Sequence, residues 1–293
     1  MHKQTINHFL LTNRKNHQIF AFWEQESPLH GGGPKEPHKN FYNMTFSYRT
    51  DSDVYAPYGS IHLVLDELLN HNDTDVDELM RRKSRDKVAV WAVSNCYQKR
   101  IEFAKSLSRA GLKVDFYGNC FGGRKIGGGR YAESFYREIS KYKFYFAFEN
   151  SISCRDYMTE KFWFNGLRSG VVPVVWGPTK EDVLKVAPSR SFIHADDFDT
   201  PQQLARYLQF LSENDGEYRK YLEWREWAKR PELVEERLRM KRRKNDLRSF
   251  CLLCAYVQQI GKSRKAGKPV PSRVVESARQ WWLGEVREGT CHS

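Results

Sequence analysis

The segment Val88-Ala-Val-Trp-Ala-Val93 contains no polar residue. Such a run needs burial on both of its faces, which is the environment of a strand inside a parallel sheet covered by helices. A helical pattern over 98–109 and apolar runs at 112–117 and 144–148 follow it. This alternation predicts an α/β protein with a doubly wound parallel sheet. Because ligands of such sheets bind outside the carboxyl ends of the strands, the polar residues after each strand become the candidate site.

Further elements are expected toward the carboxyl end of the chain. They are a helix over 159–169, a strand over 171–176, helices over 201–212, 216–227 and 247–260, and an amphipathic element over 274–283. The stretch 261–271 is rich in Lys, Gly and Pro, a composition typical of a loose segment.

The sequence before the sheet has a different character. It is rich in His, Asn, Asp and Gly, and its apolar run at 18–23 predicts a short strand. A flexible loop is expected at 31–34 and a linker over 71–85. We therefore expect three parts, which are a partial lobe with a linker (1–85), a Rossmann-like lobe with carboxyl-terminal helices (86–260) and a basic tail (261–293).

The net charge of +12 means that the surface attracts anions. Nucleic acid, acidic membranes, sulfated glycans and nucleotide diphosphates all fit that description. Part of the excess lies in basic runs at 81–85 and 237–248, which also fit a solvated face or helix. The aromatic residues fall inside apolar strand runs and do not alternate with basic residues on one face, which argues against a nucleic-acid-binding sheet.

The six cysteines are too few for a disulfide scaffold. Cys251 and Cys254 have the spacing of half a zinc site, but no second pair completes four ligands, so no metal site is expected. The triplets that begin at Asn43 and Asn72 are acceptor sites for N-glycosylation in a secretory lumen. No stretch approaches the roughly 20 apolar residues of a membrane helix, so no anchor is expected within this chain.

Polar residues follow the strand at 144–148 directly and lead into a helix. Glu149 and Asn150 come first, and Thr159, Glu160 and Lys161 stand at the expected helix start. Thr159 is expected to cap the helix, with the Glu160 carboxylate at ribose distance and Lys161 beside phosphate. A lysine at a helix amino terminus opposes the helix dipole, so it calls for an anionic partner, and a diphosphate suits that role.

Simpler interpretations stand beside this one. Glu149 and Asn150 also fit a strand-end turn that the asparagine amide closes. Tyr157 fits either a core aromatic or a ring that stacks on a base or sugar. After the strand at 88–93, Ser94 and Asn95 reach the same sheet edge, and Arg100 follows in the next helix. Arg100 fits a forked contact with phosphate or an ordinary surface arginine.

The chain resembles the α1,3-fucosyltransferase family from Glu26 to about Cys254. The shared motifs are Glu26-Ser-Pro28, Tyr48-Arg-Thr-Asp-Ser-Asp53, Pro57-Tyr-Gly59, Trp91-Ala-Val-Ser-Asn-Cys96, Tyr142-Lys-Phe-Tyr-Phe-Ala-Phe-Glu-Asn-Ser151, Asp156-Tyr-Met-Thr-Glu-Lys161, Gly170-Val-Val-Pro-Val-Val-Trp-Gly-Pro178 and Ser191-Phe-Ile-His-Ala-Asp-Asp-Phe198.

The resemblance implies a GT-B architecture of two Rossmann-like lobes, one for the acceptor and one for the donor GDP-fucose. The expected activity is transfer of fucose to the 3-position of N-acetylglucosamine in a Lewis-type glycan or an N-glycan, with inversion and without a metal cofactor. The donor contacts that carry over are Tyr58, Ser94, Asn95, Arg100, Asn150, Tyr157, Glu160 and Lys161. Among these, Arg100 and Lys161 would stabilise the leaving diphosphate, and Glu26 would be the base that takes the acceptor proton.

The resemblance also implies a type II membrane protein of the Golgi lumen, whereas only 25 residues precede Glu26 here, so the amino-terminal lobe is expected to be truncated. Family cysteines that partner Cys251 and Cys254 would lie in the missing segment. Cys96 and Cys120 stand at neighbouring strand ends of the predicted sheet and are expected to pair if their Cα separation permits. Two alternatives stay open, a truncated transferase that binds GDP-fucose without turnover and a basic glycan- or nucleic-acid-binding protein.

Overall fold

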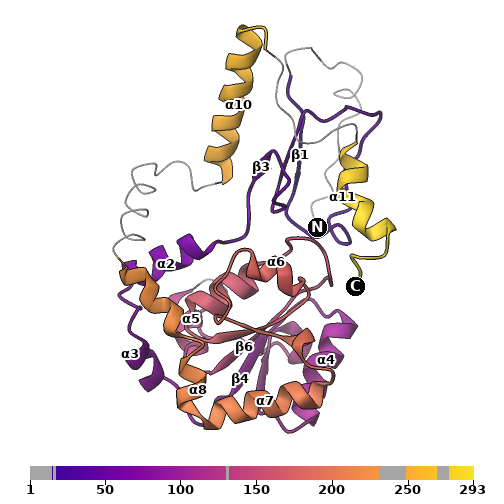
Figure 1. Ribbon diagram of the computed structural model, residues 1–293. Helices are drawn as coiled ribbons and strands as arrows, with labels where there is room; N and C mark the ends of the chain where they lie inside the picture. The colour runs from indigo at the N-terminus through magenta and orange to yellow at the C-terminus, as the bar shows by residue number, and fades with distance from the viewer. Residues whose placement is uncertain (1–14, 16–17, 130–131, 231–248, 269–276) are drawn as a thin grey trace. The chain divides into compact units, whose positions relative to one another are not determined.

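The computed structural model describes residues 15, 18–129, 132–230, 249–268 and 277–293. They fall into two compact units (Figure 1), one made of the described residues within 1–57 and 243–292 and the other of those within 58–242 together with Ser293. The division differs from the boundaries expected at 85 and 260. The reason is that the helices after residue 57 pack on the large sheet, whereas the last helices pack on the first strands.

The second unit is built on a five-stranded parallel sheet. Its strands are β4 (Ala89–Ala92), β5 (Val114–Tyr117), β6 (Phe144–Phe148), β7 (Val172–Trp176) and β8 (Ile193–His194), in the spatial order β5-β4-β6-β7-β8. The apolar runs of the sequence become its central strands, and every residue of β6 is buried. The prediction of an α/β protein with a parallel sheet is therefore confirmed.

Helices cover both faces of this sheet (Figure 1). They are α2 (Ile61–Asn70), α3 (Val76–Arg81), α4 (Gln98–Arg109), α5 (Glu133–Ile139), α6 (Lys180–Leu184), α7 (Pro201–Glu213) and α8 (Asp215–Arg219). Alternate residues of β6 enter two separate cores. Phe146 packs with α4 and α7 in one core, and Tyr145 packs with α2, α5 and the helix at Lys161–Arg168 in the other. The strand thus has the two-sided burial that its composition requires.

The first unit has a three-stranded parallel sheet in the order β1-β2-β3, formed by Ala21–Glu24, Met44–Ser47 and Val54–Tyr55. Two helices from the carboxyl end of the chain complete it, α10 (Ser249–Lys265) and α11 (Ala278–Arg287). Trp282 of α11 is fully buried, and its ring lies 5.4 Å from that of Phe22. Ile260 of α10 is buried in a core with Phe46 and Val54.

Three local predictions were wrong. The expected linker contains α3, which forms because the Asp75 side chain accepts a hydrogen bond from the Glu78 amide and caps the helix. The expected helix over 216–227 is split into α8 and a 3₁₀ segment, Glu223–Lys229. The expected loose stretch begins too early, because α10 continues to Lys265. The basic run at 237–248 lies outside the described residues.

In the part of the chain that is described, no helix combines the length and the apolar character that crossing a membrane requires.

Candidate functional site

The strand order places a topological switch point at β4, whose two neighbours are β5 on one side and β6 on the other. The carboxyl ends of β4 and β6 therefore open a crevice of the kind that binds ligands in doubly wound sheets. A hollow of about 260 Å³ lies there, and its walls include Tyr97, Lys99, Arg100, Glu149, Asn150, Ile152 and Trp176.

A larger hollow of about 550 Å³ lies elsewhere on the second unit, beside residues that precede β6 and β7. Two of the arginines that line it already form ion pairs, Arg168 with Glu67 and Glu133 and Arg82 with Asp73 and Glu78. We take the smaller hollow as the candidate site because it lies at the strand carboxyl ends, where the polar residues converge. We call it the switch-point hollow.

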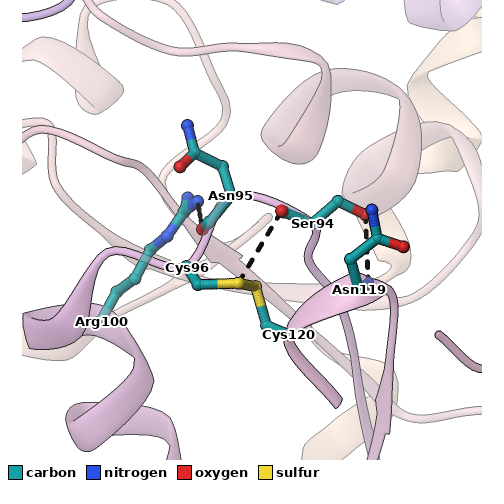
Figure 2. Close-up of a disulfide and its surroundings, with 6 residues drawn as sticks. All are labelled: Ser94, Asn95, Cys96, Arg100, Asn119 and Cys120. Carbon is teal, nitrogen blue, oxygen red and sulfur yellow. Dashed lines mark hydrogen bonds between the residues drawn. A yellow bond between two sulfur atoms is a disulfide. The ribbon is translucent and has the colours of Figure 1, made fainter. Parts of the chain in front are cut away.

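The turn after β4 is tied to the turn after β5 by a disulfide between Cys96 and Cys120, with a Cα separation of 5.5 Å. This is the pair expected from the sequence. Figure 2 shows the bridge joining the two turns, with Arg100 reaching the backbone of Asn95 from α4. The Ser94 hydroxyl accepts a hydrogen bond from the Asn119 amide at 3.4 Å, so it also links the turns. Ser94 and Asn95 are both exposed at this edge.

Arg100 is buried, with only 3% of its surface exposed, so its interpretation as a surface arginine is wrong. Its guanidinium donates to the carbonyl of Phe148, at 3.1 Å, and to the carbonyl of Asn95. Its Nε has no hydrogen-bond partner among the described residues. Burial lowers the pKa of Arg100 and the Glu149 carboxylate opposes that shift, but a guanidinium stays charged at neutral pH. The sheet edge therefore holds a fixed positive charge.

Glu149 directly follows β6 and is 2% exposed. Its amide donates to the carbonyl of Trp176, which extends the pairing of β6 with β7 by one residue. Its carboxylate accepts hydrogen bonds from the amide and hydroxyl of Thr159, at 2.9 and 2.8 Å, and from the Lys161 ammonium at 2.9 Å. Glu149 therefore joins the strand end to the start of the next helix, a role that the alternative of an asparagine-closed turn does not include.

Lys161 begins that helix, which winds as a π-helix over Lys161–Arg168. Glu160 precedes the π-helix and makes no capping bond with its side chain, whereas the Thr159 hydroxyl accepts a hydrogen bond from the Lys161 amide at 3.5 Å, so the capping role predicted for Thr159 is confirmed. The same hydroxyl also accepts a hydrogen bond from the Lys161 ammonium at 2.8 Å. Single π-turns often occur at functional sites.

The anionic partner that the sequence analysis sought for Lys161 is present within the chain. The ammonium pairs with Glu149 at 2.9 Å and lies 3.5 Å from the Glu160 carboxylate. Burial alone would lower the pKa of Lys161, but the two carboxylates raise it above its ordinary value. Lys161 is therefore a charged ammonium at neutral pH, and the need for an anion no longer argues by itself for a diphosphate.

The remaining predicted contacts of the second unit lie close to this cluster. The ring of Tyr58 meets that of Tyr157 edge to face, with 6.2 Å between centroids. Tyr157 and Glu160 are buried, and Asn150 lines the switch-point hollow. The structure thus brings the cations and the neighbouring polar groups to one edge of the sheet.

Glu26 belongs to the first unit and is exposed. It precedes a turn in which the amides of His30 and Gly31 donate to the carbonyl of Ser27. Two residues earlier, the Glu24 carboxylate accepts hydrogen bonds from the amides of Gln25 and Glu26, at 2.9 and 3.0 Å. These bonds fix the backbone that carries Glu26, while its own side chain is accessible to solvent.

The two glycosylation triplets differ in their surroundings. The Asn43 side chain accepts a hydrogen bond from the Phe20 amide at 2.9 Å, and Thr45 of the same triplet is fully buried. Asn72 is exposed and sits in a left-handed backbone conformation, with φ of 52°. Cys251 and Cys254 of α10 are free thiols.

A family model described as "Glycosyltransferase family 10 (fucosyltransferase) C-term" matches residues 82–275, and a second, "Fucosyltransferase, N-terminal", matches residues 1–59. The first of these alone covers more than half of the chain. The chain belongs to glycosyltransferase family 10. The family match includes the strands and helices that form the switch-point hollow.

Two curated relatives place the chain among fucosyltransferases of this family. The human 4-galactosyl-N-acetylglucosaminide 3-alpha-L-fucosyltransferase FUT6 is 34% identical over 256 residues, which is 87% of this chain and 64% of the relative. Mouse alpha-(1,3)-fucosyltransferase 4 is 39% identical over 210 residues, 71% of this chain and 46% of the relative. The chain therefore spans roughly half to two thirds of the length of these relatives. A solved α1,3-fucosyltransferase with GDP-fucose covers 71% of this chain, and the chain covers 66% of it, at 18% identity and a TM-score of 0.49.

Sequence reasoning missed two features of this family 10 site. Glu149 was placed in the polar cluster, with a strand-end turn as the alternative, but its pairing with Lys161 was not predicted, although an acid that follows a fully buried strand signals a charge held by a tertiary contact. Gly177 was not singled out, although its φ of 131° and its place after β7 leave room for Glu149.

Proposed function

We propose that the chain transfers fucose from GDP-fucose to a glycan acceptor, forming an α1,3 linkage to N-acetylglucosamine with inversion at the anomeric carbon. Family membership supports fucosyl transfer. The names of the human and mouse relatives support the 1,3 linkage, and the human name supports a galactosyl-N-acetylglucosaminide acceptor. That acceptor favours the Lewis-type reaction over core fucosylation of N-glycans.

The observation that carries the donor assignment is the pair of fixed cations at the switch point. Arg100 and Lys161 are held by the carbonyls of Asn95 and Phe148 and by the Glu149 carboxylate. Two positive groups at the carboxyl edge of a parallel sheet suit a diphosphate. In this proposal Tyr58, Ser94, Asn95, Asn150, Tyr157 and Glu160 contact the rest of the GDP-fucose molecule.

In the reaction, the acceptor hydroxyl oxygen bonds to the anomeric carbon as the bond from that carbon to the diphosphate oxygen breaks. The hydroxyl proton passes to the Glu26 carboxylate, and GDP leaves with its negative charge stabilised by Arg100 and Lys161. Because these two cations already supply positive charge at the leaving group, we propose that transfer needs no metal cofactor. A Golgi lumen location, with any membrane anchor outside this chain, belongs to the same proposal.

The test is incubation of the purified protein with radiolabelled GDP-fucose and a panel of acceptors. We expect labelled product from N-acetyllactosamine and none from its 3-O-methyl-N-acetylglucosamine analogue, because the attacking hydroxyl is blocked. Product from a core N-glycan alone would change the assigned acceptor from a Lewis-type glycan to the N-glycan core. GDP binding without transfer would identify a donor-binding protein without turnover, and salt-sensitive DNA binding without GDP binding would overturn the proposal.

A further inference from the structure

Glu149 is a charged residue that lines the switch-point hollow but is not among the predicted donor contacts. Its side chain is 1% exposed, so it is screened from solvent, and it faces protein groups. Its two oxygens are fully engaged with Thr159 and Lys161. A buried carboxylate so placed acts on a ligand only through its neighbours.

We infer that Glu149 is a positioning residue that holds the ammonium group of Lys161 in place for a phosphate, directly and through the hydroxyl of Thr159. The inference rests on the proposed function, because it concerns the GDP site. An ammonium group has three N–H donors. Glu149 and Thr159 take two, at 2.9 and 2.8 Å. The third is left for the Glu160 carboxylate, 3.5 Å away, or for an incoming phosphate oxygen.

The backbone around Glu149 is built to keep the carboxylate there. The bond from its amide to Trp176 fixes it to β7 at 2.9 Å. Behind it, a Cβ atom on Gly177 would lie 2.8 Å from the Glu149 Cβ, so the glycine provides the space that the side chain occupies. The Thr159 amide donates to the same carboxylate at 2.9 Å. The carboxylate is thus held from two elements and has little freedom to follow a moving lysine.

The charges around Lys161 explain why Glu149 matters to it. Burial of the ammonium lowers its pKa, the carboxylates of Glu149 and Glu160 raise it, and Arg100 lowers it. Without the Glu149 charge, the Glu160 carboxylate alone opposes the lowering of the Lys161 pKa by burial and by Arg100. The pKa of Lys161 then falls, and the neutral amine becomes populated as the pH rises.

A purely structural role for Glu149 makes a different prediction. In that case the carboxylate serves only to accept the Thr159 amide bond at the strand end. Glu149→Gln keeps an oxygen for that bond and removes the charge, so it separates the two roles. A structural role alone leaves the pH dependence of ligand binding unchanged.

The experiment measures the dissociation constant of GDP by calorimetry at pH 6.5, 7.5 and 8.5 for the wild type and Glu149→Gln. We expect the ratio of variant to wild-type constants to grow by about tenfold across this range, because a neutral Lys161 loses its attraction for phosphate. Titration of GDP itself cancels in the ratio. A constant ratio would overturn the inference. Failure of the wild type to bind GDP at any pH would overturn the proposed function instead.

A second pair of variants covers the case in which Glu149→Gln does not fold by circular dichroism. Thr159→Val keeps the shape of the side chain and loses the hydroxyl, whereas Thr159→Ser keeps the hydroxyl. We expect the pH-dependent loss of GDP affinity in Thr159→Val and wild-type behaviour in Thr159→Ser. Wild-type behaviour of both variants would contradict the inference.

Discussion

A methyl group on Gly177 would lie 2.8 Å from the Cβ of Glu149 and 2.9 Å from the carbonyl of Ser151. The φ of Gly177, 131°, is also one that other residues rarely adopt. We therefore expect Gly177→Ala to lower the free energy of unfolding by about 1–3 kcal/mol and to weaken GDP binding, because Glu149 must shift. Urea unfolding and calorimetry check the two effects. The matched variant is Gly216→Ala in α8, where an added Cβ meets nothing within 4 Å and stability should hold or rise. Equal losses in both variants would contradict the prediction.

The Cys96–Cys120 disulfide closes a loop with a sequence separation of 24. Replacing both cysteines by serine should lower the free energy of unfolding by about 3 kcal/mol. Because the bridge holds the turn that carries Asn95, whose carbonyl binds Arg100, GDP affinity should also fall at temperatures where the variant is folded. Thermal unfolding and calorimetry measure both. The control replaces the free thiols Cys251 and Cys254, and it should match the wild type in GDP affinity.

Arg100→Lys tests whether the planar guanidinium is needed. Two nitrogens of the Arg100 guanidinium bind the carbonyls of Phe148 and Asn95. A lysine has a single nitrogen, so it cannot bind both carbonyls in this geometry and also bind phosphate. We expect at least a tenfold loss of GDP affinity, about 1.4 kcal/mol, with the fold retained. The control is Arg109→Lys on the same helix, where the side chain is 67% exposed. Full GDP affinity in Arg100→Lys would remove Arg100 from the donor site.

Glu26→Gln separates binding from turnover. The exposed carboxylate is the proposed base, so we expect GDP affinity to remain and the transfer rate to fall by about 10²–10⁴. Lys161→Ala should instead abolish GDP binding, because it removes one of the two cations proposed to bind the diphosphate. Calorimetry and the radiolabel assay give the two readings.

Glu24 is the rival for the role of base, because it lies two residues away and burial raises its pKa. Its carboxylate is occupied by the amides of Gln25 and Glu26, so we expect Glu24→Gln to weaken the turn and reduce turnover only modestly. If Glu24→Gln abolished transfer and Glu26→Gln did not, the assignment of the base would pass to Glu24.

The sequence predicted the parallel sheet well, because its evidence is local. The all-apolar runs at 88–93 and 144–148 became β4 and β6, and α4 has the predicted bounds, Gln98–Arg109. The α3 helix was missed although Asp75 and Glu78 form a capping pattern, since the surrounding charge suggested a linker.

The candidate site was predicted only in part, because its chemistry depends on contacts between distant residues. The residue types at 94–100 and 149–161 indicated anion binding, and the structure brings both segments to one sheet edge. The burial of Arg100 and the partner of Lys161 depend on the carbonyl of Phe148 and on Glu149, 48 and 12 residues away in the chain. Periodicity and capping rules describe a segment by itself, so they do not reveal such pairs.

The first unit takes its strands from residues 21–55 and its helices from residues 249–287. During synthesis the strands of the first unit emerge early, long before the helices that cover them, whereas residues 58–242 of the second unit emerge in one continuous block. The second unit is thus able to fold on the ribosome, and the first unit is completed only near the end of translation. A premature stop codon after residue 242 would therefore strip the early strands of their cover and leave the five-stranded sheet intact.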